Sequence, residues 1–141
     1  MPPAAPVSPA MSARIIHTSL MLGVVTFYAV AWYIGSRTSM PISAVPERRV
    51  LYLGLFLISA IVFGAAAYRA GRLTPPGPGT SQDDWWRANL GRAIAVWGLV
   101  EAPTLLGTVA YLVTHDFRTL VATFAGLLFL VNYRPSRLAE G

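Results

Sequence analysis

One acidic side chain stands in the middle of a long apolar stretch, where an ionisable group can do the most chemistry. Residues 92–113 read RAIAVWGLVEAPTLLGTVAYLV, long enough to cross a bilayer as a helix, and Glu101 lies near the midpoint. A charge at the bilayer centre costs about 3 kcal/mol on insertion scales. No basic residue stands at a comparable depth in the other apolar stretches. We therefore expect Glu101 to be neutral and protonated.

Other polar residues fall on the side of this helix that carries the acid. At about 100° per residue, Thr104 and Thr108 share the face of Glu101, and His115 lies near the same line at the helix end. These four residues predict a polar stripe that runs from the bilayer midplane to one membrane surface. Access from one side is what a carboxyl that binds protons or ions needs.

Pro103 adds a second feature beside the acid. A proline inside a helix removes one backbone hydrogen bond and kinks the helix, which here frees the carbonyl of Leu99. That carbonyl could accept the proton of Glu101. The alternative is structural: a neutral Glu101 bonded to a backbone carbonyl or a nearby threonine would clamp two helices together, a contribution of about 1 kcal/mol.

The run Gly98-Leu99-Val100-Glu101-Ala102, with Leu105 and Gly107 after it, resembles the carboxylate-bearing helix of rotary ATP synthase proteolipids (subunit c). The resemblance implies that Glu101 would be the proton or sodium site. The chain as a whole resembles a group of bacterial four-helix integral membrane proteins that carry an acid in the third helix. That second resemblance implies a four-helix membrane fold.

His17 is a weaker candidate for ligand binding. With Ala13 four residues before it, this histidine is similar to the pigment-ligand helix of light-harvesting proteins, which implies a chlorophyll magnesium or haem ligand. The alternative for His17 is an interfacial polar residue, and for His115 a loop residue. No Ser/His/Asp set, metal-spaced cluster or phosphate loop can be assembled, and Lys and Cys are absent. We therefore expect no enzyme activity, metal or cofactor, and lipid or pigment contact at most.

The composition indicates a membrane protein. Of 141 residues, 55% are hydrophobic and 12% charged, whereas a soluble domain carries about 25% charged residues. The net charge of +5 rests on arginine alone. Because the arginines flank the apolar runs, they indicate membrane anchors and not a nucleic-acid surface.

Prolines, glycines and arginines divide the chain into apolar spans and polar connections. The predicted segments are an extended Pro/Ala-rich tail (1–13), a first transmembrane helix (14–35), a second (50–68), a Pro/Gly-rich loop (69–80), an interfacial start continuing into a third transmembrane helix (82–113), a short fourth (117–133) and a tail (134–141). Ser81 with Asp84 predicts the cap of the third helix, and Asp116 predicts the cap of the fourth.

Aromatic and small residues predict how the spans are anchored and packed. The expected interface anchors are Trp32, Tyr33, Trp85, Trp86 and Tyr133. Ala60 and Gly64 are spaced so that another helix can approach closely. We expect these two residues to pack within the chain in preference to forming a dimer face.

The arginine distribution predicts the orientation. Four spans place both termini on one side, which holds Arg14, Arg69, Arg72, Arg87, Arg92, Arg134 and Arg137, against Arg37, Arg48, Arg49 and Arg118 on the other. The positive-inside rule then places both termini in the cytoplasm. The predicted fold is an all-α membrane protein with four transmembrane helices in two hairpins, in a bacterial inner membrane.

Two functions remain open from the sequence. The first is a non-catalytic accessory or scaffold subunit of a larger membrane complex of the energy-transducing kind, respiratory or photosynthetic. Its partners would be membrane lipids and other integral membrane subunits in a homo- or hetero-oligomer, with no nucleic acid. The second is a proton- or ion-translocating, proteolipid-like protein that uses Glu101.

Overall fold

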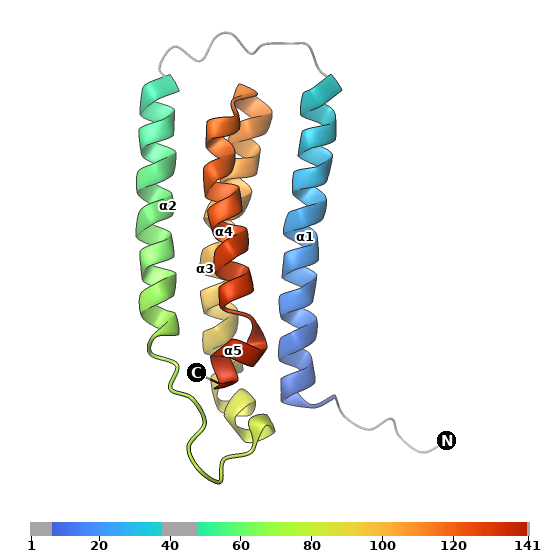
Figure 1. Ribbon diagram of the computed structural model, residues 1–141, viewed down its shortest axis with the longest axis vertical. Coiled ribbons are helices and arrows are strands. Elements are labelled where there is room, and N and C mark those ends of the chain that lie inside the picture. The colour runs from blue at the N-terminus through green and yellow to red at the C-terminus, as the bar shows by residue number, and fades with distance from the viewer. Residues whose placement is uncertain (1–6, 38–47, 141) are drawn as a thin grey trace, which may run out of the picture.

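The computed structural model describes residues 7–37 and 48–140, and this part of the chain is helical with no strand (Figure 1). In chain order, the elements are α1 (Pro9–Arg37), α2 (Arg48–Ala70), α3 (Gln82–Thr114), the 3-10 turn η1 (Phe117–Thr119), α4 (Leu120–Asn132) and α5 (Pro135–Glu140). Three of them, α1, α2 and α3, are long and apolar enough to cross a membrane. The chain is thus an all-helical membrane protein, as its composition predicts.

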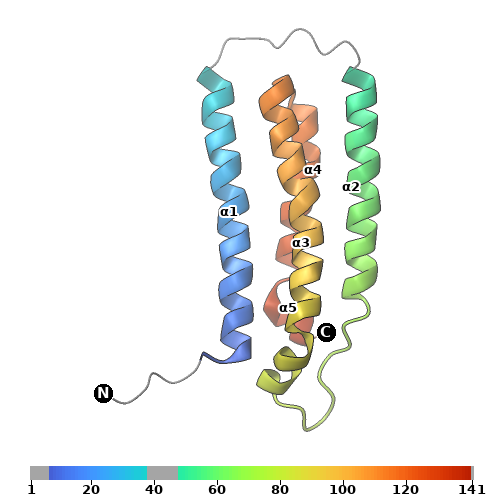
Figure 2. The same ribbon diagram turned by 180° about the vertical axis from the view of Figure 1, so that it is seen from behind.

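Helix α3 is the centre of the bundle. It packs against α1, α2 and α4, and 50% of its apolar part is buried, compared with 17% of α1 and 22% of α2. Figures 1 and 2 show α1 and α2 on opposite sides of the α3 and α4 pair. The prediction of two hairpins is therefore right for α3 with α4 and wrong for α1 with α2. Helices α1 and α2 each pack against the wide buried surface of α3, and this packing does not require contact between α1 and α2.

The start of α1 corrects the prediction of an extended tail over residues 1–13. The helix begins at Pro9, and the Ser8 hydroxyl accepts a hydrogen bond from the Met11 amide at 3.3 Å. Proline suits the first position of a helix, because its fixed φ matches the helix and its missing amide hydrogen would have no helical partner there. Residues 1–6 lie outside the described part of the chain.

The second and third helices follow their predicted bounds closely. Helix α2 is two residues longer at each end than the predicted span over 50–68. Helix α3 covers the predicted 82–113 and adds Thr114. Most of the polar connection between α1 and α2 falls on residues 38–47, outside the described residues.

Helix α4 is the short member of the bundle. Asp116 begins this segment as expected: its carboxylate accepts a hydrogen bond from the Arg118 amide at 2.9 Å and another from the Tyr52 hydroxyl of α2 at 2.6 Å. The 13 residues of α4 span roughly 20 Å at 1.5 Å per residue, less than the hydrocarbon thickness of about 30 Å. Residues 7–37 and 48–140 thus contain three helices of spanning length and one shorter apolar helix.

The predicted tail over 134–141 also needs correction. Residues Pro135–Glu140 form α5, and its Leu138 and Ala139 are buried in the core at the end of the bundle where α1 and α3 begin. Two apolar residues one position apart in a six-residue segment give no helical period, so the sequence alone did not reveal this helix.

Candidate functional site

Two residues of the predicted polar stripe are turned toward α4. Thr104 and Thr108 are fully buried in the α3 and α4 interface. The hydroxyl oxygens of Thr108 and Thr123 lie 3.0 Å apart, and the Thr123 hydroxyl donates to the Thr104 carbonyl at 3.1 Å. The Thr104 hydroxyl donates to the Val100 carbonyl at 2.5 Å. The Thr108 and Thr123 hydroxyls therefore join α3 to α4, as polar groups in a membrane interior commonly do, whereas the Thr104 hydroxyl bonds within α3.

Glycines let these two helices approach closely. A β-carbon on Gly126 of α4 would lie 1.7 Å from the Thr104 hydroxyl oxygen, far inside contact distance. A β-carbon on Gly107 of α3 would lie 2.8 Å from the Thr123 hydroxyl oxygen. Each glycine thus makes room for a threonine of the facing helix, which is the small-residue packing that membrane helices favour.

The sequence predicts this kind of packing within the chain for Ala60 and Gly64 of α2, and the structure contradicts that prediction. Ala60 and Gly64 are exposed, and nothing lies within 4 Å of a β-carbon on Gly64. The spacing of Thr104 with Thr108, and of Thr119 with Thr123, is the same four-residue spacing of small residues and could have indicated the real contact.

Glu101 lies apart from the threonines. Its side chain is half-buried, and it forms no hydrogen bond or ion pair with any residue in the described part of the chain. The expected bond to the Leu99 carbonyl freed by the buried Pro103 is not formed, nor is a clamp to a threonine. The carboxyl thus has no bonding partner among the described residues.

His115 does not continue the stripe either. It ends α3 in the left-handed backbone conformation, with φ of 52°, and its amide donates to the Tyr111 carbonyl at 2.7 Å. It lies fourteen positions after Glu101, which corresponds to roughly 21 Å along the helix axis. The four predicted residues thus form one threonine pair and two separate groups.

His17 closes the end of α4. Its Nε2 lies 3.0 Å from the Leu130 carbonyl, and because a carbonyl only accepts, Nε2 carries the hydrogen. The Trp97 indole donates to the Tyr133 carbonyl at 2.8 Å, and its ring meets the His17 ring edge-on at 5.1 Å. Carbonyls at the end of a helix lack helical donors, so these two side chains satisfy them. A pigment or haem could take Nε2 only by breaking this cap.

The predicted aromatic anchors divide into two groups. Trp32 and Tyr33 at the end of α1 are 41% and 57% exposed, as anchors would be. Trp85 and Trp86 are 5% and 2% exposed, so the expectation that they contact headgroups is wrong. The Trp85 indole instead donates to the Thr74 carbonyl at 2.8 Å, and both rings fill the core. Tyr133 is half-buried.

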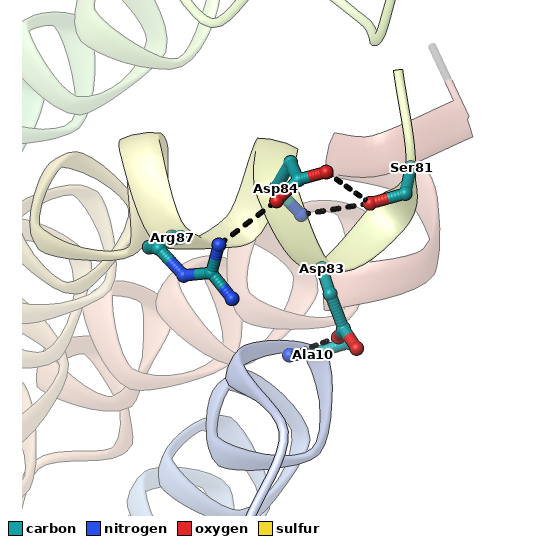
Figure 3. Close-up of polar contacts among 5 residues, drawn as sticks. All are labelled: Ala10, Ser81, Asp83, Asp84 and Arg87. Atoms are coloured by element: carbon teal, nitrogen blue, oxygen red, sulfur yellow. Dashed lines mark hydrogen bonds and ion pairs between the residues drawn. The ribbon is translucent and has the colours of Figure 1, made fainter. Parts of the chain in front are cut away.

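The first turn of α3 also caps α1 (Figure 3). The Ser81 hydroxyl accepts from the Asp84 amide at 3.1 Å, as its spacing predicted, and donates to the Asp84 carboxylate at 2.7 Å. Asp84 forms an ion pair with Arg87 at 2.9 Å. The Asp83 carboxylate accepts from the Ala10 amide of α1 at 3.3 Å. A carboxylate at a helix N-terminus is favourable, so Asp83 fixes the start of α1 to α3.

A shallow groove lies on the outer face of α1. It measures about 530 Å³ and is lined by Ser19, Leu22, Gly23, Thr26, Phe27 and Val30. Nothing lies within 4 Å of a β-carbon on Gly23. Five of these six residues, all except Phe27, are exposed, and each of the five is apolar or small. Sequence reasoning missed this surface because α1 lacks a strong glycine repeat.

Within the described residues, no group of three or more His, Cys, Asp or Glu side chains could hold a metal ion.

No family model, curated protein or solved structure matches this chain, so its function has to be inferred from its own residues.

Proposed function

We propose that this protein is a non-catalytic accessory or scaffold subunit of a larger integral membrane complex. The observation that supports this role is the groove on α1, where Ser19, Gly23 and Thr26 leave room for a second helix. In lipid, helices associate through close backbone contact and hydrogen bonds, because hydrocarbon gives no hydrophobic drive. A face of small and hydroxyl-bearing residues turned to lipid is suited to such a contact.

Glu101 supports the same role. Helices α1 and α3 run parallel, and the ring pairs His17 with Trp97 and Trp32 with Tyr111 fix their register. This register places Glu101 at about the depth of Leu22, within the length of the groove. An unbonded carboxyl at that depth is costly, and a donor on a partner helix would satisfy it.

Five hydrogen-bonded side chains of the bundle interior support a structural role over a catalytic one. Thr104, Thr108 and Thr123 are bonded to one another and to backbone carbonyls, and His17 and Trp97 are engaged as caps. Each of these side chains has a hydrogen-bond partner, and each hydrogen bond holds two helices together or satisfies a backbone carbonyl.

For the orientation, we propose four crossings in a bacterial inner membrane with both chain ends in the cytoplasm. Seven arginines lie at or near the end where α1 and α3 begin: Arg14, Arg69, Arg72, Arg87, Arg92, Arg134 and Arg137. Arginine-rich ends stay on the cytoplasmic side. The short α4 would cross by local thinning of the bilayer or by shielding from its neighbours.

Site-specific crosslinking tests the subunit role, because the chain has no cysteine and a single one can be placed at will. A photoreactive probe on Leu22→Cys, in native membranes, is expected to give one discrete adduct with a stoichiometric membrane protein. The same probe on Leu128→Cys of α4, where Leu128 is 70% exposed, is the matched control and should label lipid only. A monodisperse, partner-free protein with equal labelling at both positions would contradict the proposal.

The second candidate is proton or ion translocation, as the resemblance to proteolipids implies. The observation that favours it is the absence of any bond to Glu101 in the described residues. Carbodiimide labelling of the purified protein tests it: a proton- or sodium-binding acid reacts in a pH-dependent manner and is protected by the ion. Glu101→Gln is the control that removes the label. Labelling unaffected by pH and sodium would exclude this candidate.

A further inference from the structure

A basic hollow lies between α3, at residues 91–95, and the end of α2 with the turn that follows it. It measures about 590 Å³ and is lined by Tyr68, Arg69, Arg72, Leu73, Gly91, Arg92 and Ala95. Three of these seven residues are arginines: Arg69 lies at the end of α2, Arg72 in the turn after it, and Arg92 on α3. The hollow lies at the end of the bundle where α3 begins, at the edge of its apolar part.

The charge in this hollow has no acidic counterpart among the residues that the structure describes. No acidic residue lines it, and the one ion pair in the described part of the chain, Arg87 with Asp84, does not include a lining residue. Arg69 and Arg92 form no hydrogen bond with the described residues. Guanidinium groups present paired donors that match the geometry of phosphate oxygens. An anion of that geometry would satisfy them.

Arg72 is already held in place. It donates to the Tyr68 hydroxyl, and its guanidinium carbon lies 4.9 Å from the centre of the Tyr68 ring. A cation stacked on an aromatic ring loses less conformational freedom when it binds a ligand. Tyr68 thus positions one of the three charges before any anion arrives.

A strip of small residues continues from the hollow into the membrane. On α3, Gly98 and Ala102 follow Gly91 and Ala95 at helical spacing, and Gly98 and Ala102 are exposed. Nothing lies within 4 Å of a β-carbon on Gly91 or Gly98. An acyl chain can pack along such a strip, whereas a free phosphate ion has no apolar part that would contact it. The strip therefore distinguishes a lipid from an inorganic anion.

We propose that the hollow binds the phosphodiester headgroup of an anionic glycerophospholipid, with Arg69, Arg72 and Arg92 on the phosphate and an acyl chain along Gly98 and Ala102. Basic pockets between helices on the cytoplasmic side are suited to anionic lipid headgroups. This site does not depend on the subunit role proposed above, and it assigns a specific lipid class to one position in the bundle.

Native mass spectrometry with added lipids tests the site. The full-length protein in mild detergent is expected to retain phosphatidylglycerol over phosphatidylcholine, and R69Q/R92Q should lower phosphatidylglycerol retention at least ten-fold. The matched control is R134Q/R137Q, because Arg134 and Arg137 line a different hollow at the same end and their loss changes the net charge equally. The control should leave retention within two-fold.

Three results would overturn the proposal. Equal retention of the two lipids would remove the selectivity for anionic headgroups, and equal losses in the two double variants would indicate general surface charge. Displacement of phosphatidylglycerol by millimolar inorganic phosphate would indicate an anion site without a lipid. Arg69 and Arg92 are exposed and form no hydrogen bond with the described residues, so R69Q/R92Q should unfold at the same temperature as the wild type when followed by circular dichroism. The single variants R69Q and R92Q should each lose part of the phosphatidylglycerol retention.

Discussion

His17 caps the end of another helix, a structural role that the sequence around a single histidine in an apolar helix does not indicate. It reaches from α1 to the last turn of α4, where the Leu130 carbonyl has no helical donor. Water cannot substitute for such a donor inside a membrane, so an unbonded carbonyl there is costly. His17 and Trp97 together let α4 end within the protein instead of in a solvated loop.

Replacing His17 tests this task. His17→Ala removes the donor to the Leu130 carbonyl and the edge contact with Trp97, so the free energy of unfolding should fall by about 1–2 kcal/mol. Titration with sodium dodecyl sulfate in mixed micelles, followed by tryptophan fluorescence, measures the loss. Thr18→Ala, at the exposed neighbouring position, is the control and should change little. Equal stability of the two variants would mean that the cap contributes nothing.

The sequence was sufficient to predict which polar residues share a helix face, but not which residues they would contact. Helical spacing placed Thr104 and Thr108 together, and the structure confirms that they share a buried face. It could not show which helix they would meet, because Thr123 lies 15 residues beyond Thr108 and the contact depends on how the chain turns at His115. For the same reason a capping role for His17 could not be read from its neighbours.

At the scale of elements, the crossing of α3 and α4 depends on a glycine. Gly126→Ala would place a β-carbon 1.7 Å from the Thr104 hydroxyl oxygen and 2.7 Å from its β-carbon, so the helices must separate. We expect the free energy of unfolding to fall by about 2–3 kcal/mol. Gly98→Ala, with nothing within 4 Å of the new carbon, should be neutral or add about 1 kcal/mol through helix propensity. The same detergent titration measures both, and a loss at Gly98 as large as that at Gly126 would refute this account.

Helix bounds were predictable where composition changes sharply and unpredictable where it does not. The cap at Ser81 and the polar residues after Val113 defined α3 correctly. The starts of α1 and α5 were not predictable in this way, because proline breaks a helix in its interior, whereas both of these helices begin with a proline, Pro9 and Pro135. A proline in the first turn favours the start of a helix, whereas a proline in the interior kinks or ends it.

For the whole molecule, the orientation can be tested with single cysteines. Thr80→Cys marks the loop between α2 and α3, and Phe117→Cys marks the turn between α3 and α4, at the opposite end; both native residues are exposed. A membrane-impermeant maleimide should label position 117 in spheroplasts and position 80 in inverted vesicles, because the arginine-rich end stays in the cytoplasm. The reverse pattern would contradict the proposed orientation.

The overall architecture was predictable in its class and not in its arrangement. Apolar length and low charge sufficed for a helical membrane protein, since few other structures can satisfy a backbone in lipid. The separation of α1 from α2 was not predictable, because it depends on the buried surface of α3, and every apolar residue of that helix suits lipid as well as protein.

The central position of α3 has a consequence for biosynthesis. Because α1 and α2 precede α3 in the chain and lie on either side of it, both enter the bilayer before the surface that will receive them has been translated. We therefore expect α1 and α2 to remain unassociated in the membrane, and tertiary structure to begin only once residues 82–114 have left the ribosome. A truncated product that stops before Gln82 should insert, fail to assemble and be cleared by membrane proteases.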